Sequence, residues 1–530
     1  MSHAGDAADV EWALDNRIYT NWSGAGVCAP GRARARPGAQ TPTKEASIPQ
    51  LYFTDLAVLR NSAPVDGAVS EFSAAAIAAA ENSGLVDGMP FILGRGGTYD
   101  HDLNRFFRAC PTLGVGSLNS LRAYARDILV WIRFLAERRE DKSVWSADRE
   151  DIAAFHEARR LSPPPYRICA ASWNRSIAAL DKLYRWAADE KLIAKSPFTY
   201  RQAWSRATGG PAMTIAANCA AERGARTSDV RFLSLDRYLL FREVGLRGRL
   251  PEGREDPAWQ GRNSERNALF AELLVTTGLR LQEATSLLAV ELPSLDVSGD
   301  PQRRSRSFQL AAATAKGGRG RQIRMPERLL KRLHEHIALE RANALVRWRT
   351  HERLQCVARP IEVLGRDRRS LLLQDGVSRT RLDMLTPGER VRLIWADTLE
   401  PLALWLTEGG QPMPMASWEA VFRRASARCR RFGIDIDVTP HMLRHTFAVN
   451  MLSLLVREQI GWVLDERSAH VGASYRRLIG DPLLKLQRLM GHRRIESTHI
   501  YLDHLDESQE LVDAAVDEWG LRSASREAAA

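Results

Sequence analysis

The most constraining feature of the chain is a long amphipathic period over 117–138, SLNSLRAYARDILVWIRFLAER. Its apolar side chains recur at steps of three and four residues, which is the spacing of one face of an α-helix. Ser117 stands at the start as a candidate N-cap. Further helices are predicted near 149–159, before a Ser-Pro-Pro-Pro break, and over about 171–191. Such helices bury their apolar faces against one another, so we expect a small helical bundle.

The composition excludes several classes of protein. The chain has 530 residues, of which 45% are hydrophobic, so wholesale disorder is excluded. No apolar run is long enough for a membrane-spanning helix, and the acidic residues Asp6, Asp9 and Glu11 argue against a secretory signal. Isolated cysteines without a CxxC pair exclude a zinc ribbon and favour the cytoplasm; they lie at 28, 110, 169, 219, 356 and 429.

The net charge of +11 favours an anionic partner, with nucleic acid as the default candidate. Simple solubility is the alternative. In the predicted bundle, four basic side chains are candidate phosphate contacts: Arg122, Arg126, Arg175 and Lys182. A solvated helix face explains each of them equally well.

Beyond the bundle, helical patterns resume near Leu233 and are interrupted at Thr277-Gly278. Two runs around a Gly-rich turn predict a β-hairpin over 307–325. The expected fold class is therefore mainly α with a small β-hairpin or sheet (α+β). We expect these parts: a partly flexible extension at 1–83 with a short helix at 73–82, a helical domain at 84–207, a linker at 208–232, a second domain at 233–520 with insertions near 342–400 and 459–481, and a tail at 521–530.

The first motif with chemical potential is TGLRLQEA at 277–284. Arg280 lies in an apolar segment, where a charge is costly unless it is paired. Glu283, three residues on, is placed to hold the guanidinium from one side. The pair is either a buried structural ion pair or an oriented fork presented to a phosphate.

The second motif is the hairpin tip AKGGRGR at 315–321, which contains Lys316, Arg319 and Arg321. It is the most basic neighbourhood of the predicted folded part, since nine Lys or Arg and one acid fall between 303 and 331. Glycines beside Lys316 allow a sharp turn and close approach to a ligand. An ordinary basic turn is the alternative.

The third motif is TPHMLRHTF at 439–447. Thr439 is a good N-cap, and a proline at the first helical position follows it. His441 and Arg444 then share one face of the first turn, where free N–H groups favour an anion. Alternatively, His441 and His445 at i, i+4 share a metal, although no third ligand motif accompanies them.

The fourth motif is LQRLMGHRRIESTHIY at 486–501. Gly491 is suited to end a helix. On one continuous helix His492 and Tyr501 would be separated by ~13 Å of rise. A break at Gly491 would fold them toward one site. The alternative for Tyr501 is a packed amphipathic residue.

Together and in this order, the four motifs resemble the tyrosine recombinase (phage integrase) family, over about 233–515. The bundle is similar to the family's core-binding domain, and the length suggests a large integrase or transposase of a mobile element. The resemblance implies a two-domain clamp around DNA and a covalent 3′-phosphotyrosyl intermediate. It implies Tyr501 as nucleophile, Arg280 and Arg444 as phosphate ligands, Lys316 as proton donor to the departing 5′ oxygen, His441 as general acid/base and His492 as a phosphate hydrogen-bond donor. Glu283 and His445 would support them, and Arg319 and Arg321 would contact DNA.

This chemistry requires neither ATP nor a metal, because the phosphotyrosine bond retains the energy of the linkage. Accordingly, we expect no cofactor, since neither a GxxxxGK[ST] loop nor a metal cluster is recognisable. Alternatives are a type IB topoisomerase, a DNA-binding protein without catalysis and a metal-dependent transposase. The expected partners are duplex DNA with recombination sites, three further copies in a tetramer, and accessory proteins of the element. The expected location is the cytoplasm, associated with the nucleoid when bound to DNA.

Overall fold

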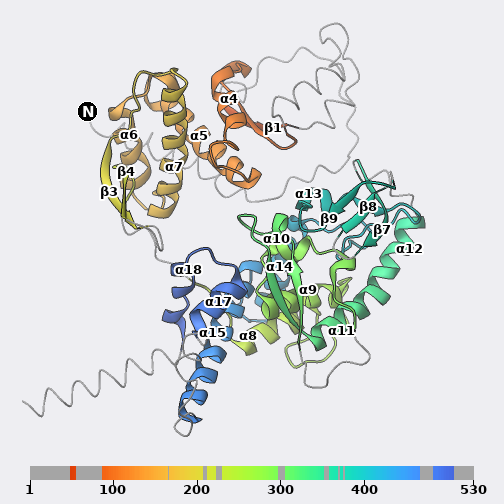
Figure 1. Cartoon of the computed structure of the whole chain (residues 1–530). Helices are drawn as coiled ribbons and strands as arrows, with labels where there is room; N and C mark the ends of the chain where they lie inside the picture. The colour runs from red at the N-terminus through yellow and green to blue at the C-terminus, as the bar shows by residue number, and fades with distance from the viewer. Residues whose placement is uncertain are drawn as a thin grey trace, which may run out of the picture. The chain divides into compact units, whose positions relative to one another are not determined.

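The computed structural model describes residues 48–54, 86–164, 166–206, 212–222, 230–295, 305–350, 357, 359–367, 370–373, 376–465 and 481–505. The chain divides into two compact units, unit 1 (Met1–Thr227) and unit 2 (Ser228–Ala530), coloured red to yellow and green to blue in Figure 1. The short helix expected at 73–82 and the tail expected at 521–530 lie outside the described residues.

Unit 1 contains the predicted helical bundle. The long helix α5 follows Ser117, whose hydroxyl accepts a hydrogen bond from the Ser120 N–H and thereby caps the helix as predicted. A short π-helical segment, Glu157–Leu161, extends the second predicted helix, α6, toward the proline run. The helices are α4 (His101–Ala109), α5 (Leu118–Arg138), α6 (Arg149–His156) and α7 (Ala170–Asp189).

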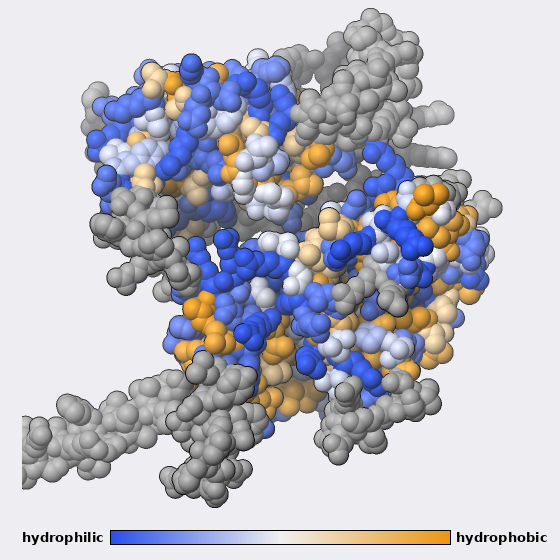
Figure 2. All heavy atoms as spheres, viewed as in Figure 1, coloured by the Kyte–Doolittle hydropathy of each residue, from blue (hydrophilic) through white to orange (hydrophobic). Residues whose placement is uncertain are grey.

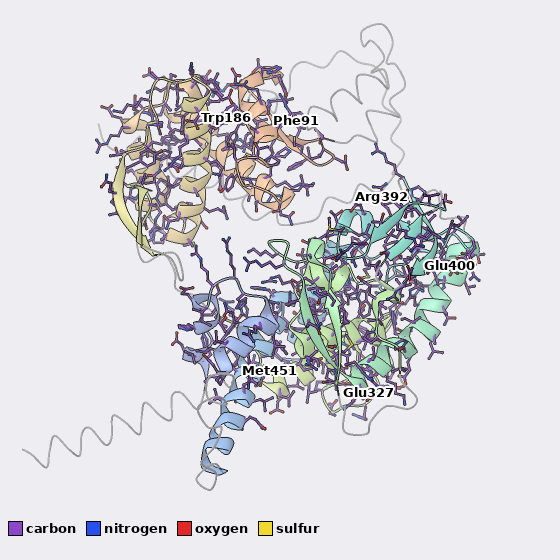
Figure 3. All side chains as sticks on the ribbon, in the orientation of Figure 1. Phe91, Trp186, Glu327, Arg392, Glu400 and Met451 are labelled. Atoms are coloured by element: carbon purple, nitrogen blue, oxygen red, sulfur yellow. The ribbon has the colours of Figure 1, made fainter. Side chains whose placement is uncertain are left out.

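Aromatic side chains form the core of unit 1. The buried Trp131 of α5 donates its indole N–H to the Tyr184 hydroxyl of α7 at 2.8 Å, which satisfies two buried polar groups together. Trp186, labelled in Figure 3, packs its ring on Phe106 of α4 at 5.4 Å between centroids. These contacts join helices that are distant in sequence.

Unit 1 also contains α4 and two antiparallel strand pairs that the sequence patterns did not predict. The pairs are β1 (Gln50–Phe53) with β2 (Pro90–Leu93), and β3 (Tyr200–Arg206) with β4 (Ala212–Asn218). Strand β4 therefore occupies a stretch that was expected to be linker. Its pairing with β3 is a contact between two segments, which the small-residue composition of either one alone does not reveal.

Unit 2 is a mainly helical unit around a second core, in which Phe270 stacks on Trp418 at 3.6 Å. The predicted break in the helical run is confirmed, because α9 ends at Thr277 and Gly278 takes a φ of 64°. A Cβ at Gly278 would come within 2.3 Å of the Phe447 ring, so only glycine fits. Its helices are α8 (Leu235–Leu240), α9 (Ser264–Thr277), α10 (Leu281–Thr285), α11 (Glu327–His336), α12 (Ala342–Thr350), α13 (Pro387–Arg390), α14 (Met415–Arg431), α15 (Pro440–Asp465), α17 (Pro482–Met490) and α18 (Glu496–His499).

The predicted hairpin is present as β5 (Ser305–Leu310) and β6 (Arg321–Pro326), paired antiparallel from Leu310 with Arg321 onward. The first insertion carries a four-stranded sheet with the order β10-β7-β8-β9, which the sequence patterns did not predict. Its strands are β7 (Ile361–Asp367), β8 (Ser370–Leu373), β9 (Arg379–Arg381) and β10 (Leu393–Trp395). The fold class is thus α+β, as expected.

The surface of this inserted sheet is partly apolar, as Figure 2 shows by the orange residues over this part of unit 2. Leu364 and Met384 are 51% and 67% exposed. Among the described residues, none of the helices has the length and apolar character needed to cross a bilayer.

Candidate active site

The buried carboxylate of Glu283 organises one side of the site. It accepts a hydrogen bond from Arg280 Nη1 at 2.8 Å and two from Arg321, at 2.9 and 2.7 Å. Burial alone would raise the pKa of Glu283, but the hydrogen bonds and charge of Arg321, together with Arg280, lower it to about 2. Glu283 is therefore ionised at neutral pH and fixes two guanidiniums.

Arg444 lies on the first turns of α15 and is 2% exposed. Its guanidinium donates to two backbone carbonyls, that of Gly278 after α9 and that of Met490 at the end of α17, the latter at 2.6 Å. Burial, and next the charge of Arg280, lower the pKa of Arg444 to about 9. Arg444 thus stays charged at pH 7, held by neutral carbonyls close to a second cation.

His492 follows the end of α17, where Gly491 adopts a φ of 63° as the C-cap. A Cβ there would lie 2.9 Å from Arg321 Cδ, so the glycine also admits the arginine. His492 Nδ1 shares a hydrogen bond with the Thr498 hydroxyl at 3.0 Å. Burial, and then the charge of Arg444, lower the pKa of His492 to about 3, so its ring is neutral.

Tyr501 is 2% exposed, and its hydroxyl is 3.0 Å from His445 Nδ1. The ring of His492 lies parallel to that of Tyr501, with 6.2 Å between centroids, so the break at Gly491 does bring the two residues together. Burial raises the pKa of Tyr501, while the charges of Arg444 and Arg280 act to lower it. Burial, and then His441, lower the pKa of His445 to about 4, which leaves a neutral ring beside the phenol.

His441 and Lys316 form the exposed rim of the site. The ring of His441 contacts that of His445 edge-on, at 4.3 Å between centroids. Partial loss of water around the ring lowers the pKa of His441, and the charges of Arg444, Arg280 and Lys316 lower it further. Lys316 stands in the β5–β6 turn, and Arg319 is exposed in the same turn.

The position of Arg321 differs from the predicted contact with DNA, because its guanidinium lies inside the site against Glu283 and the Leu489 carbonyl. The alternation of β6 contained this signal: Arg321, Ile323 and Met325 are buried, and the residues between them are exposed. The sequence reasoning also missed Thr498, which orients His492. No local signal marks that threonine, since the contact depends on the turn after Gly491.

The basic candidates of unit 1 also differ from one another. Arg175 makes two hydrogen bonds to Asp127, and Lys182 donates to the Leu113 carbonyl at 2.7 Å. Arg122 donates to the Gly88 carbonyl at 3.3 Å and lies over the Phe53 ring. Arg126 is exposed on α5. Three of the four thus hold unit 1 together in the described structure.

Two family models match the chain: the phage integrase N-terminal SAM-like domain over residues 103–191, and the phage integrase family over residues 257–456. Together they cover more than half of the sequence. The chain belongs to the phage integrase (tyrosine recombinase) family. The SAM-like match falls in unit 1 and the catalytic match in unit 2. No significant match to a curated protein sequence was found.

Solved structures of three recombinases share parts of this architecture. XerH recombinase bound to difH substrate is 14% identical with a TM-score of 0.41, over 78% of this chain and 86% of the other. The Tn1549 transposon integrase in complex with circular-intermediate DNA is 15% identical with a TM-score of 0.35, over 71% and 87%. A lambda integrase dimer bound to a COC′ core site is 15% identical with a TM-score of 0.35, over 75% and 94%. Because these TM-scores are low, the assignment rests on the family models.

Proposed function

We propose that this tyrosine recombinase is the site-specific integrase of a mobile element, and that it cuts and rejoins DNA through a 3′-phosphotyrosyl intermediate. The observation that carries this proposal is the position of Tyr501. Its hydroxyl is hydrogen-bonded to the neutral ring of His445, within the electrostatic field of Arg280 and Arg444. A phenol with a pKa near 10 needs such a base and a positive field to attack at neutral pH.

The cationic cluster suits a phosphodiester, whose negative charge repels nucleophiles. Arg280 and Arg444 would bind the non-bridging oxygens, where charge grows in the transition state. Each well-placed donor of this kind contributes roughly 3–4 kcal/mol. Glu283 neutralises only part of the cluster, so a net positive charge faces the ligand.

The proton steps follow from the positions of the histidines and the lysine. The Tyr501 oxygen would form a bond to phosphorus and its proton would pass to His445, with His441 in edge-on contact beyond it as acid/base. The bond from phosphorus to the 5′ oxygen breaks, and that oxygen takes a proton from Lys316. With Nδ1 accepting from the Thr498 hydroxyl, the neutral ring of His492 would carry its single proton on Nε2 and donate that N–H to the phosphate.

The assembly would follow the family resemblance. The helical domain at 84–207 and the catalytic domain at 233–520 would clamp duplex DNA, joined by the segment at 208–232. Four copies would exchange strands between two recombination sites, with accessory proteins of the element selecting the direction. The enzyme would work in the cytoplasm on the nucleoid. The net charge of +11 supports DNA as the partner.

Replacing the nucleophile tests this proposal. The substrate is a labelled, nicked duplex carrying repeats from the ends of the proposed element, and the product is a covalent adduct resolved on a denaturing gel. Tyr501→Phe removes one hydroxyl and should abolish the adduct. Tyr238→Phe is the matched control, since it removes a hydroxyl from another buried tyrosine of unit 2 and should preserve the adduct. Adduct formation by Tyr501→Phe would refute the assignment, and relaxation of plasmid lacking the repeats would favour a topoisomerase.

A further inference from the structure

The inserted sheet is attached to the catalytic core through Arg390, at the end of α13. This side chain is 2% exposed. It donates to both carboxylate oxygens of Glu291, at 2.7 and 2.9 Å, and to the Ser286 carbonyl at 3.0 Å. It also donates to carbonyls of its own insertion, at Leu382 (2.6 Å) and Leu385 (3.1 Å). One guanidinium thereby joins two parts of unit 2.

The core side of this junction is the end of the helix that presents Arg280. Helix α10 begins directly after Arg280, and Ser286 is its C-cap. A cation bonded to the carbonyl at a helix C-terminus satisfies an otherwise unpaired acceptor and complements the helix dipole. Arg390 therefore fixes the far end of the short helix whose near end carries a proposed phosphate ligand.

A second contact reaches the base of the lysine turn. The Ala313 N–H, in a short 3₁₀ helix (Ala312–Thr314), donates to the Asp383 carbonyl of the insertion at 3.0 Å. The Asp383 carboxylate accepts two hydrogen bonds from Arg381, the last residue of β9. Lys316 follows the 3₁₀ helix by two residues, so the inserted sheet adjoins the start of its turn.

The tip of that turn has little packing of its own. Gly317 and Gly318 adopt φ values of 79° and 69°, and a Cβ at either position would meet no described atom within 4 Å. The position of Lys316 is therefore set at the base of the turn, where β5, β6 and the insertion meet. An error of ~1 Å in the position of a reacting group can cost roughly 10²-fold in rate.

We propose that the inserted sheet, residues 361–395, is a positioning element that holds the Lys316 turn in register with the Arg280 helix through Arg390 and Asp383. This inference deepens the proposed function and rests on Lys316 as the proton donor to the 5′ oxygen. The sheet contributes no reacting group. It acts on one step, the departure of the 5′ oxygen, through the backbone that carries the lysine.

A sulfur-substituted substrate isolates that step. When sulfur replaces the 5′-bridging oxygen of the scissile phosphate, the leaving group is a thiolate. Thiols are far more acidic than alcohols, as the cysteine pKa near 8.5 illustrates, so no proton donor is needed. Arg390→Gln should cleave the oxygen substrate roughly 10–100-fold more slowly than the parent protein and cleave the sulfur substrate at about the parent rate. Rates are measured as single-turnover adduct formation by the full-length protein.

Three further variants complete the design. Lys316→Ala should show the same rescue by sulfur. Arg381→Ala, which removes a 65% exposed side chain and poses little risk to folding, should show a smaller defect of the same kind. Arg379→Gln removes an ion pair with Asp367 on the same sheet, away from the junction, and should behave as the parent.

The outcomes distinguish failure of the Lys316 assignment from failure of the positioning role. If Lys316→Ala is rescued by sulfur but Arg390→Gln is equally slow on both substrates, the positioning role is wrong and the lysine assignment stands. If Lys316→Ala is not rescued, the lysine assignment fails and the positioning role fails with it. If Arg390→Gln does not fold, parent rates for Arg381→Ala on the oxygen substrate overturn the inference.

Discussion

The two units use buried acids in different ways. In unit 1 Asp127 accepts two hydrogen bonds from Arg175 and one from Ser176, and the arginine side chain is 52% exposed. In unit 2 Glu283 has no exposed side-chain surface and holds both Arg280 and Arg321, whose side chains are 22% and 7% exposed. The first acid bonds to one guanidinium and joins α5 to α7. The second acid bonds to two guanidiniums.

The excess positive charge at the unit 2 site is larger than the contacts of Glu283 alone indicate. Arg444 is held by carbonyl groups, and the charge of Arg280 lowers its pKa after burial does. Three guanidiniums thus surround one carboxylate, an arrangement that costs stability unless an anion is bound. The comparison teaches that a structural ion pair and a phosphate site can differ in how many guanidiniums bond to one buried acid.

The largest effect should come from neutralising the acid in each unit. Glu283→Gln leaves two arginines without a counter-charge and should lower the free energy of unfolding by about 3–5 kcal/mol, with loss of cleavage. Asp127→Asn should cost about 1 kcal/mol, because water solvates the half-exposed Arg175 in its place. Urea denaturation followed by tryptophan fluorescence measures both. Equal losses in the two variants would remove the distinction between the pairs.

A smaller effect should appear in the pH dependence of stability. In the folded protein the pKa values of His445 and His492 are about 4 and 3, below the ordinary value of 6.5, mainly because of burial. The unfolded chain therefore binds more protons, and the stability of unit 2 should fall as the pH drops from 6.5 toward 4. Glu283, with a pKa near 2 against an ordinary 4.5, adds to the loss only below pH 4.5.

The same titration distinguishes the units. The hydrogen bond from Lys142 lowers the pKa of Asp148 in unit 1 to about 2, so its contribution is lost only below pH 3.8. Melting temperatures between pH 7 and 4.5 should fall for the parent protein and fall less for His445→Asn. An unchanged slope in that variant would show that His445 is not the group that titrates.

Local patterns predicted the parts of the fold whose determinants are local. The Ser117 cap, the break at Gly278 and the hairpin around Lys316 each depend on residues within a few positions. The inserted sheet was missed because its strands pair across gaps, including a parallel pair between β7 and β10. The interior position of Arg321 was missed because its charge was weighed without the alternation of its strand.

The candidate site was predicted as a set of residues but not in its connections. The order of the motifs, through the family resemblance, proposed Arg280, Arg444 and Tyr501, because the motifs that contain them are continuous in sequence. Which histidine meets the Tyr501 hydroxyl depends on how α15 faces the turn after α17, and the structure gives His445. Such contacts between elements have no local signal.

The smallest effects should come from replacing exposed cations for which the described part of the structure shows no structural role. Arg126 on α5 and Arg319 in the lysine turn are exposed, whereas Arg122 donates to the Gly88 carbonyl. If the first two meet phosphates, Arg126→Ala and Arg319→Ala should each reduce the slope of log affinity against log salt by about 1, with stability unchanged. Arg122→Ala should leave that slope as it is and lower the stability of unit 1. Fluorescence anisotropy with labelled duplex over a KCl series measures the slopes. If Arg122→Ala reduced the slope by the same amount, Arg122 would contact DNA in spite of its hydrogen bond within unit 1.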